Sequence, residues 1–305
     1  MSLRVDCDAG ASPVGLLRAE DWNMATDVER LKPIGPLADW MRSNTSNIPM
    51  LPEVAARVIT LASSPDVTIS HLAQLITKDQ VLTTRLLSLA NSAYYMSSID
   101  VTTVPEAIMR MGAGAVRNLA VTLCVTSRMR DRNVYGAHGQ LLVDHGLGTA
   151  YVARLVADDA GADPDQAFLC GLLHDIGKMV ILKWHYDHVK RTGQAMDATE
   201  LAELLTRWHP QVASLAFRRW GLPSELDEPV LHHHDYTQAT TARRMAAVIY
   251  LANRLSHRYG FGCEPDATDL LSDPVTSELE LDAEWLAEID QRAPGLFKVA
   301  REALS

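Results

Sequence analysis

Leu169–Leu182 reads LCGLLHDIGKMVIL, an apolar segment in which a histidine and an aspartate stand side by side. At helical spacing its apolar side chains form one buried stripe, and His174 and Lys178 lie one turn apart along the edge of that stripe. We therefore predict a single buried helix, over 164–186, that carries His174, Asp175 and Lys178. Burying an imidazole, a carboxylate and an ammonium group costs several kcal/mol unless they pair with other groups or hold a metal ion. The rest of the chain must supply those partners.

The composition is that of a globular protein. The chain has 305 residues, of which 47% are hydrophobic, enough to bury a full core. Its 28 basic and 38 acidic residues give a formal charge of −10, which argues against an extended surface for nucleic acid or anionic membrane. Four scattered cysteines, and the lack of a signal-peptide pattern or of an apolar run of about 18 residues, predict reduced thiols in a cytoplasmic protein without a membrane span.

Helical periodicity extends on both sides of the central segment, and strand-like alternation is rare. We predict an all-α protein with two helical lobes, the first over 47–130 and the second over 139–258, separated by a charged stretch that contains glycine. An extension with one short helix, 1–46, precedes the first lobe, and a helical extension, 259–305, follows the second. The helices are predicted at 51–61, 69–77, 80–92 and 105–129, the last bent at Gly112 to Gly114, then at 140–159, 164–186, 198–208, 210–220, 223–232, 241–258, 277–292 and 295–304.

Histidines at or near predicted helix ends in the second lobe are candidate partners for the central segment. Imidazole and carboxylate ligands together suit zinc, iron, manganese or nickel. Because consecutive residues diverge by about 100° on an α-helix, His174 and Asp175 could serve two points of one metal site or two neighbouring metals. The alternative is a hydrogen-bonded polar network at the place where an ancestral metal site stood. The candidate metal ligands are His145, His174, Asp175, His209, His233 and His234.

The remaining histidines are predicted to play no part in this site. His232, the first of three adjacent histidines, is expected to face away from it. The residues expected to be surface or hydrogen-bonded histidines are His71, His138, His185, His188 and His257.

The order of the candidate ligands and the sequence before them are similar to known families. His145, then HDIGK at 174–178, then His209, then His233 and His234 resemble the HD superfamily of metal-dependent phosphohydrolases, in which such residues hold metals that activate water against a phosphate ester. The first lobe contains LPEV, KDQVLTTRLL, LANSAYY and MGAGAVRNL, which resemble the HDOD family, the HD-related output domains of bacterial signalling proteins. This resemblance covers roughly 47–257 and implies an all-α fold of two helical lobes with a regulatory role.

Two departures from the pattern of active HD enzymes argue against the enzymatic activity that this resemblance implies. In HD-GYP phosphodiesterases the paired histidines are followed by a glutamate and an Asp-Gly-x-Gly-Tyr-Pro loop, whereas here DYTQATTARR follows His234. The aspartate that closes the metal site on a later helix corresponds to Asn253, a neutral and weaker ligand. The resemblance therefore implies a metal held less tightly than in an active enzyme, or none.

Three functions are compatible with these observations. The first is a bacterial, cytosolic signal-transduction module that acts through contacts with a partner protein, with a divalent metal or a polar network as a structural pin. The second is a metal-dependent phosphohydrolase acting on a nucleotide or cyclic dinucleotide, in which Asp175 and Lys178 are catalytic and Lys178 stands near the phosphate. Outside an enzyme, Lys178 would be a solvated lysine at a helix end or a salt-bridge partner of Asp175. The third is a sensor that binds a nucleotide or phosphate without cleaving it.

Overall fold

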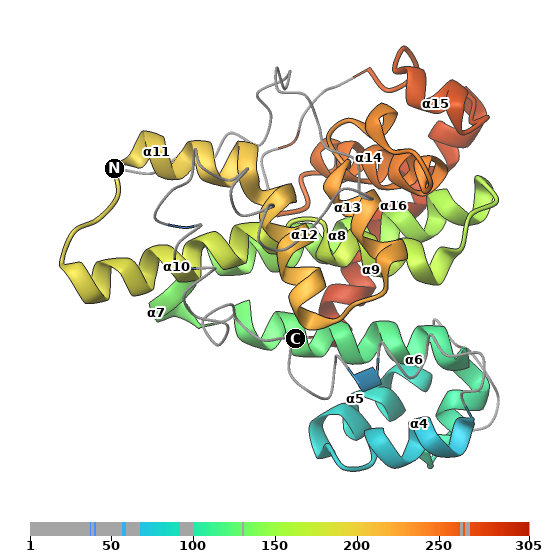
Figure 1. The fold of residues 1–305 in the computed structure, drawn as a ribbon. Coiled ribbons are helices and arrows are strands. Elements are labelled where there is room, and N and C mark those ends of the chain that lie inside the picture. The colour runs from blue at the N-terminus through green and yellow to red at the C-terminus, as the bar shows by residue number, and fades with distance from the viewer. Residues whose placement is uncertain are drawn as a thin grey trace.

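The computed structural model describes residues 37, 40, 57–58, 68–91, 100–129, 131–262, 265 and 269–304. All regular secondary structure in these residues is helical, which confirms the predicted all-α class (Figure 1). The predicted N-terminal helix and the predicted helix over 51–61 lie outside the described residues, except for residues 37, 40, 57 and 58, which are helical.

Three helices of the N-terminal lobe pack around one hydrophobic cluster. α4 (Ile69–Ile76), α5 (Gln80–Ala90) and the first part of α6 (Val104–Met129) enclose it. α4 and α5 begin where the sequence predicts, because the side chains of Thr68 and Asp79 cap their first turns by accepting backbone N–H groups.

α6 bends at Gly112, as predicted. The φ of 81° and ψ of 158° at this residue lie outside the helical region, and glycine adopts them because it has no Cβ. Residues of α6 up to Ala120 belong to the core of the N-terminal lobe, whereas Val121, Val125 and Met129 belong to that of the second lobe. Among the described helices, α6 alone is long and apolar enough to cross a membrane, but 56% of its most apolar stretch is buried inside the protein, as in a core helix.

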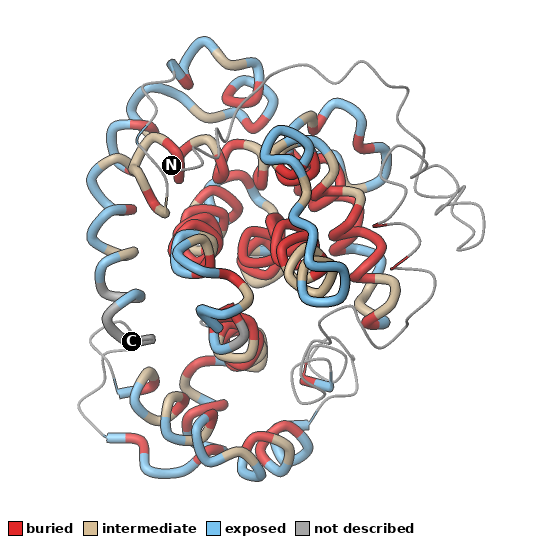
Figure 2. The backbone as a smooth tube through the Cα atoms, turned by 90° about the vertical axis from the view of Figure 1, so that its left-hand side faces the viewer, coloured by how far each residue is buried: buried red, intermediate tan, exposed pale blue. Residues whose placement is uncertain are grey.

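The second lobe is built around α8 (His138–Asp159), which contacts both α9 (Pro164–Leu173) and α14 (Arg243–Arg258). Beside them, α10 (Ile176–Thr192) packs against α12 (His209–Trp220). Buried residues gather where these helices meet, and Figure 2 shows this interior in red. The short helices of the lobe are α7 (Arg132–Tyr135), α11 (Ala198–Glu203), the π-helix η4 (Leu204–Trp208), η5 (Ser224–Leu226), α13 (Asp227–Leu231) and η6 (Tyr236–Gln238).

The predicted single helix over 164–186 is wrong, because the chain breaks at His174 and Asp175. α9 packs against α8, whereas α10 packs against α12, so the chain must change direction between them. Asp175, with φ −98° and ψ 9°, directly precedes α10. The predicted ligand pair therefore lies in a turn between two buried helices and not along the edge of one helix.

The C-terminal extension contains α15 (Pro274–Glu278) and one long helix, α16 (Ala283–Leu304), where the sequence predicts two helices at 277–292 and 295–304. Pro294 lies inside α16 and removes one backbone N–H from its hydrogen-bond ladder. The helix continues through it because the apolar face of α16 is buried in the core of the second lobe. α16 contacts α8 and also α5, so it touches both lobes (Figure 1).

Candidate metal centre

All six predicted metal ligands lie together in the second lobe. Four elements carry them: α8, the turn between α9 and α10, the start of α12, and the turn after α13. Their ligand atoms form two groups, and within each group all the atoms lie within 4.8 Å of one another. The first group is His145, His174 and Asp175, and the second group is His209, His233 and His234.

In the first group, two imidazoles direct unprotonated nitrogens at each other. The Nδ1–H of His145 donates to the carbonyl oxygen of Phe261 at 3.0 Å, and the Nδ1–H of His174 donates to that of Gly171 at 2.7 Å. A carbonyl can only accept, so each Nδ1 carries the ring proton and each neutral ring has a lone pair on Nε2. The two Nε2 atoms are 3.2 Å apart.

Burial keeps both rings neutral. It lowers the pKa of His145 well below its usual range, the neighbouring His174 lowers it further, and Asp175 offsets only part of the effect. Burial likewise lowers the pKa of His174. Two lone pairs thus face each other at hydrogen-bond distance with no proton between them, an arrangement that a cation between the rings would stabilise. This set of atoms fits a divalent metal ion, because imidazole binds such ions in its neutral form.

Asp175 joins the two groups through its two carboxylate oxygens. Oδ2 lies 3.5 Å from Nε2 of His174 and 3.7 Å from Nε2 of His145, while Oδ1 lies 3.1 Å from Nε2 of His209. Burial raises the pKa of Asp175, but the Lys178 ammonium group and His174 lower it more, so the pKa stays well below its usual range. Within the described part of the chain, Oδ1 is buried and makes no hydrogen bond of good geometry. A shared carboxylate with an unsatisfied oxygen fits a site for two metal ions.

The second group opens to solvent. Nε2 of His209 lies 3.2 Å from Nε2 of His233 and 3.1 Å from Nε2 of His234. The Nδ1–H of His233 donates to the carbonyl oxygen of Val230 at 2.6 Å, so its Nε2 also carries a lone pair. Burial lowers the pKa of His209 to about 4, and Lys178 adds to the effect. Since His209 and His233 are buried and His234 is exposed, solvent reaches this group from the side of His234.

Asn253 lies where the resemblance places the residue that closes the site. Its Oδ1 is 3.0 Å from Nε2 of His145. Lys178 donates from Nζ to Oδ2 of Asp175 at 2.7 Å, so it is a salt-bridge partner of Asp175, one of the roles expected from the sequence, and not a solvated lysine at a helix end. The positive charge of Lys178 therefore lies inside the site, where the side chain is 10% exposed.

Some residues that surround the candidate ligands were not predicted from the sequence. His257, expected to be a surface or hydrogen-bonded residue, is buried beside His145, with ring centroids 4.8 Å apart. Its spacing of four residues from Asn253 on α14 could have indicated this place, because positions i and i+4 share a helix face. The carbonyl groups that hold the Nδ1 atoms have no sequence signal, since any residue supplies one.

Two glycines let the ligand-bearing helices approach closely. A Cβ on Gly177 of α10 would lie 1.9 Å from the carbonyl oxygen of His209, and a Cβ on Gly171 of α9 would lie 2.8 Å from that of Thr149 in α8. Backbone atoms in packed helices cannot move aside as the end of a flexible side chain can. The short helix separations that bring the ligands together therefore need glycine at these positions.

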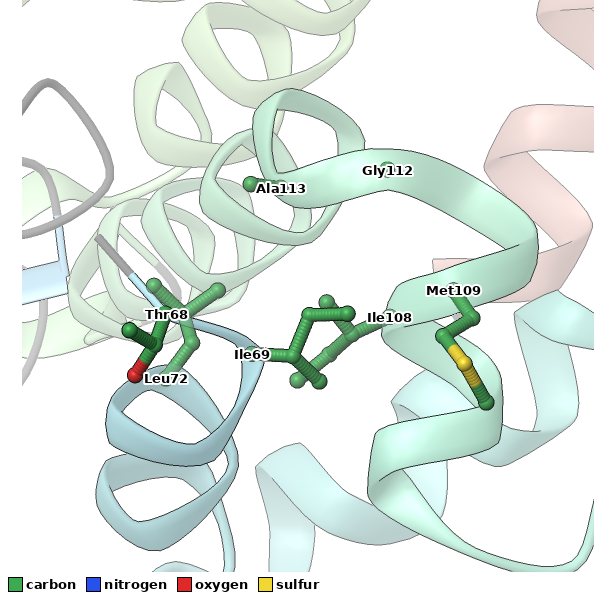
Figure 3. Close-up of a pocket in the computed structure, with 7 residues that line it drawn as sticks. All are labelled: Thr68, Ile69, Leu72, Ile108, Met109, Gly112 and Ala113. Carbon is green, nitrogen blue, oxygen red and sulfur yellow. The ribbon is translucent and has the colours of Figure 1, made fainter. Parts of the chain in front are cut away.

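A cavity on the N-terminal lobe has none of this chemistry. It has a volume of about 310 Å³ and lies between α4 and α6, next to the bend at Gly112 (Figure 3). None of its described lining residues is ionisable, so they offer neither a metal ligand nor a general base. The lining residues are Thr68, Ile69, Leu72, Ile108, Met109, Gly112 and Ala113.

Comparisons with known proteins identify the fold family. The model of the HDOD domain family matches residues 48–236, more than half of the chain. The structure of an HDOD domain protein of unknown function from Geobacter sulfurreducens is similar over 92% of this chain and 99% of that chain, with a TM-score of 0.70 and 22% sequence identity. At this identity the likeness shows the fold alone.

Curated relatives match over a smaller part of their own length. An uncharacterized protein of Treponema pallidum is 25% identical over 214 residues, which are 67% of this chain and 40% of the relative. Ribonuclease Y of Thermus thermophilus is 29% identical over 120 residues, which are 39% of this chain and 17% of the enzyme. The chain thus spans less than half the length of either relative. On the evidence of the family match over 48–236 and of the shared fold, the chain belongs to the HDOD family.

Proposed function

We propose that this protein is a signal-transduction protein of the HDOD family whose second lobe binds divalent metal ions. The observation that carries the proposal is the pair of lone pairs that His145 and His174 direct at each other across 3.2 Å. The alternative, a hydrogen-bonded polar network, needs a proton between those nitrogens, yet both ring protons are already donated to backbone carbonyl groups. A cation between the rings removes this conflict.

Two ions suit the arrangement of the ligands, because each oxygen of Asp175 faces a different group of histidines. Imidazole-rich sets with one carboxylate favour iron, manganese, zinc or nickel over magnesium or calcium. Asn253 adds a neutral oxygen beside His145, so the ion there is expected to bind more weakly than one closed by an aspartate. We call His145, His174 and Asp175 the first metal position, and His209, His233, His234 and Asp175 the second metal position.

Metal analysis of the purified protein tests this proposal. We expect protein purified without added metal to contain divalent ions by mass spectrometry, and chelated protein to take them up again. His174→Ala is expected to lose the ion of the first position, because it removes one of the facing lone pairs. His71→Ala, at an exposed histidine of α4, is the matched control and is expected to retain both ions. Wild-type protein that holds no ion after incubation with iron, manganese, zinc or nickel contradicts the proposal.

In the signalling role, information passes through contacts with a partner protein in the bacterial cytosol. Metal binding would serve this role by holding the buried turn at His174 and Asp175 in one conformation. Affinity purification from the source organism, with wild type and His174→Ala as bait, tests the role. We expect a partner that is captured by the metal-loaded wild type and lost with the variant. Equal capture by both would mean that binding of the partner does not depend on the metal.

Phosphoester hydrolysis is a second candidate function, and two observations favour it. The ammonium group of Lys178 lies in the site, where it can offset negative charge on a phosphate, and the exposed side of His234 gives a ligand access. The relative ribonuclease Y is by its name an RNA-cleaving enzyme. A bound metal ion would supply a water molecule of lowered pKa as the nucleophile. Asp175 would hold the two metal positions at a constant separation through its two oxygens.

A hydrolysis assay separates the two functions. Metal-loaded protein is incubated with bis(p-nitrophenyl) phosphate, nucleotides and cyclic dinucleotides, and His174→Ala and His71→Ala are assayed in parallel. Turnover that disappears in His174→Ala and persists in His71→Ala supports the enzyme. Bound metal without turnover of any of these substrates leaves the signalling role as the function.

A further inference from the structure

α14 ends in a turn whose backbone holds a ligand histidine. Gly260, with φ +67°, donates its N–H to the carbonyl oxygen of His257, and Phe261 donates its N–H to that of Ser256, both at 3.0 Å. This pair of hydrogen bonds is a Schellman motif, which sets the direction of the chain after the helix. The carbonyl group of Phe261 then points at α8, where it accepts the Nδ1–H of His145 at 3.0 Å.

The ring of Phe261 is held between two helices. On one side it lies against Gly148 of α8, where a Cβ would be 2.5 Å from a ring atom. On the other side it stacks on Phe297 of α16, with ring centroids 4.1 Å apart and an angle of 25° between the planes. The position of the Phe261 backbone, and of the carbonyl group that orients His145, therefore depends on α16.

α16 contacts the same turn at a second point. Asp290 accepts hydrogen bonds from the Tyr259 hydroxyl at 2.8 Å and from the Arg258 guanidinium group at 2.9 Å. Asp290 and Phe297 are seven residues apart, so they lie about two turns from each other on the same face of α16. One face of α16 thus binds the whole turn that follows α14.

Phe297 also connects the two lobes. It packs against the hydrophobic cluster of the N-terminal lobe as well as that of the second lobe, and α16 contacts both α5 and α8. α16 lies beyond residues 48–236, so the match to the HDOD family assigns it no role.

We propose that Phe297 is a positioning residue for the metal ligand His145 and acts on it through the carbonyl group of Phe261. The consequence for metal affinity rests on the proposed metal binding, whereas the positioning itself is a property of the metal-free protein. Loss of the hydrogen-bond partner behind a ligand histidine typically weakens metal binding about 10- to 100-fold. Phe297→Ala keeps this partner but removes its support, so we expect about tenfold weaker binding in the first metal position and unchanged binding in the second.

Trp285 provides a matched control on the same helix. It is a partly buried aromatic residue of α16, and its Nε1–H donates to Oδ2 of Asp159 at 2.8 Å. Asp159 is 14 residues from His145 along α8, a distance of about 21 Å. Trp285→Ala removes a larger ring from α16, at a contact with α8 that is far from His145, so a general loosening of α16 would affect both variants alike.

¹⁵N NMR of histidine-labelled, metal-free protein measures the positioning directly. We expect the Nδ1–H of His145, assigned by its absence in His145→Gln, to give a slowly exchanging ring signal in the wild type and in Trp285→Ala. The signal should broaden or disappear in Phe297→Ala, because solvent then reaches the weakened hydrogen bond. An unchanged signal in Phe297→Ala, or an equal loss in Trp285→Ala, overturns the proposal.

Titration with Co²⁺ as the probe metal measures the consequence for binding. Calorimetry is expected to resolve two steps in the wild type, of which only one is weakened in Phe297→Ala. Equal weakening of both steps, or of neither, overturns the proposal. If the wild type binds no Co²⁺, the proposed metal binding fails, while the NMR signal still decides whether Phe297 positions His145.

Discussion

At the scale of single residues, the candidate metal centre depends most on Asp175. One of its oxygens faces His145 and His174 and the other faces His209, so both metal positions share it. His174→Ala and His234→Ala are each expected to weaken one position. Asp175→Asn is expected to weaken both at once, and by more than the about 10- to 100-fold that loss of a partner behind a ligand costs. Metal content and a two-step titration of the three variants measure this difference.

A control must separate loss of the ligand from damage to the fold. Asp175→Asn breaks the buried salt bridge with Lys178, and breaking such a pair typically costs about 3–5 kcal/mol. The double variant Asp175→Asn/Lys178→Met removes both charges and is expected to recover much of that stability while its metal binding stays as weak as in Asp175→Asn. If Asp175→Asn loses only one of the two ions, the carboxylate is not shared and the two-metal arrangement is wrong.

The carboxylate of Glu228 accepts hydrogen bonds from the residues at the start of α14, and this makes the stability of the fold depend on pH. It is 4% exposed and accepts hydrogen bonds from the backbone N–H and hydroxyl groups of Thr240 and Thr241 and from the N–H of Ala242. Burial raises the pKa of Glu228, but these hydrogen bonds lower it more, to about 2, against an ordinary value of 4.5. The stabilisation is therefore complete above about pH 5 and is lost as the pH falls from about 4.5 towards 2.

Glu228→Gln keeps the shape of this side chain and removes its charge. We expect a loss of about 1–3 kcal/mol in the free energy of unfolding at pH 7, and a difference from wild type that shrinks as the pH falls from about 5 to about 2. Urea unfolding of metal-free protein at several pH values measures both. Glu225→Gln, at an exposed glutamate of η5, is the control and should change stability by less than about 0.5 kcal/mol. A difference that stays constant over this pH range would contradict the role given to the carboxylate.

At the scale of helices, the contact of α10 with α12 brings Asp175 to His209. Gly177→Ala places a methyl group 1.9 Å from a backbone oxygen of α12, so the two helices must separate. We expect a loss of about 1–3 kcal/mol in unfolding free energy and weaker binding in both metal positions. Gly295→Ala in α16 is the matched control, because a Cβ there meets no atom within 4 Å among the described residues, and it should raise stability by up to about 1 kcal/mol. Similar effects of the two changes on metal binding would show that this contact is unimportant.

The helices also show how far the fold could be predicted from the sequence. Apolar periodicity predicted α4 and α5, and the glycines of α6 predicted its bend, because these features depend on neighbouring residues. The break between α9 and α10 could not be predicted in the same way, since Leu169–Leu182 keeps a helical apolar spacing throughout. It arises because the two halves pack on different helices. The break predicted between 292 and 295 is absent for a related reason, since burial of α16 outweighs the one hydrogen bond that Pro294 removes.

The candidate site, like the fold, could be predicted only in part. Its six candidate ligands could be picked out from the sequence, because histidines with the HD pair are unusual in a buried apolar context and resemble a known pattern; their role as metal ligands stays a prediction. Their arrangement could not, because it depends on how four separate elements pack. The hydrogen bond between His145 and Phe261, for example, joins residues 116 positions apart, and the accepting group is a backbone carbonyl.

At the scale of the whole molecule, α16 links the candidate metal centre to the N-terminal lobe. His145 is held by the backbone of Phe261, Phe261 stacks on Phe297, and Phe297 packs against the core that α5 helps to form. Each contact in this series is direct, so a change in the mobility of His145 affects the mobility of the residues beyond it. Metal binding is therefore expected to stabilise a region that extends well past the ligands.

Hydrogen exchange followed by mass spectrometry measures how far this stabilisation extends. Adding Co²⁺ to the metal-free wild type is expected to slow amide exchange by several-fold near the ligands, in the turn at 258–262, in α16 and in α5. Asp175→Asn is the control for effects of the ion itself and should show no protection. In Phe297→Ala, protection should persist at the second metal position and disappear from α5, because the contact that carries it has been removed. Protection in the wild type that stops at the ligand-bearing segments would mean that the lobes are not coupled to the metal through α16.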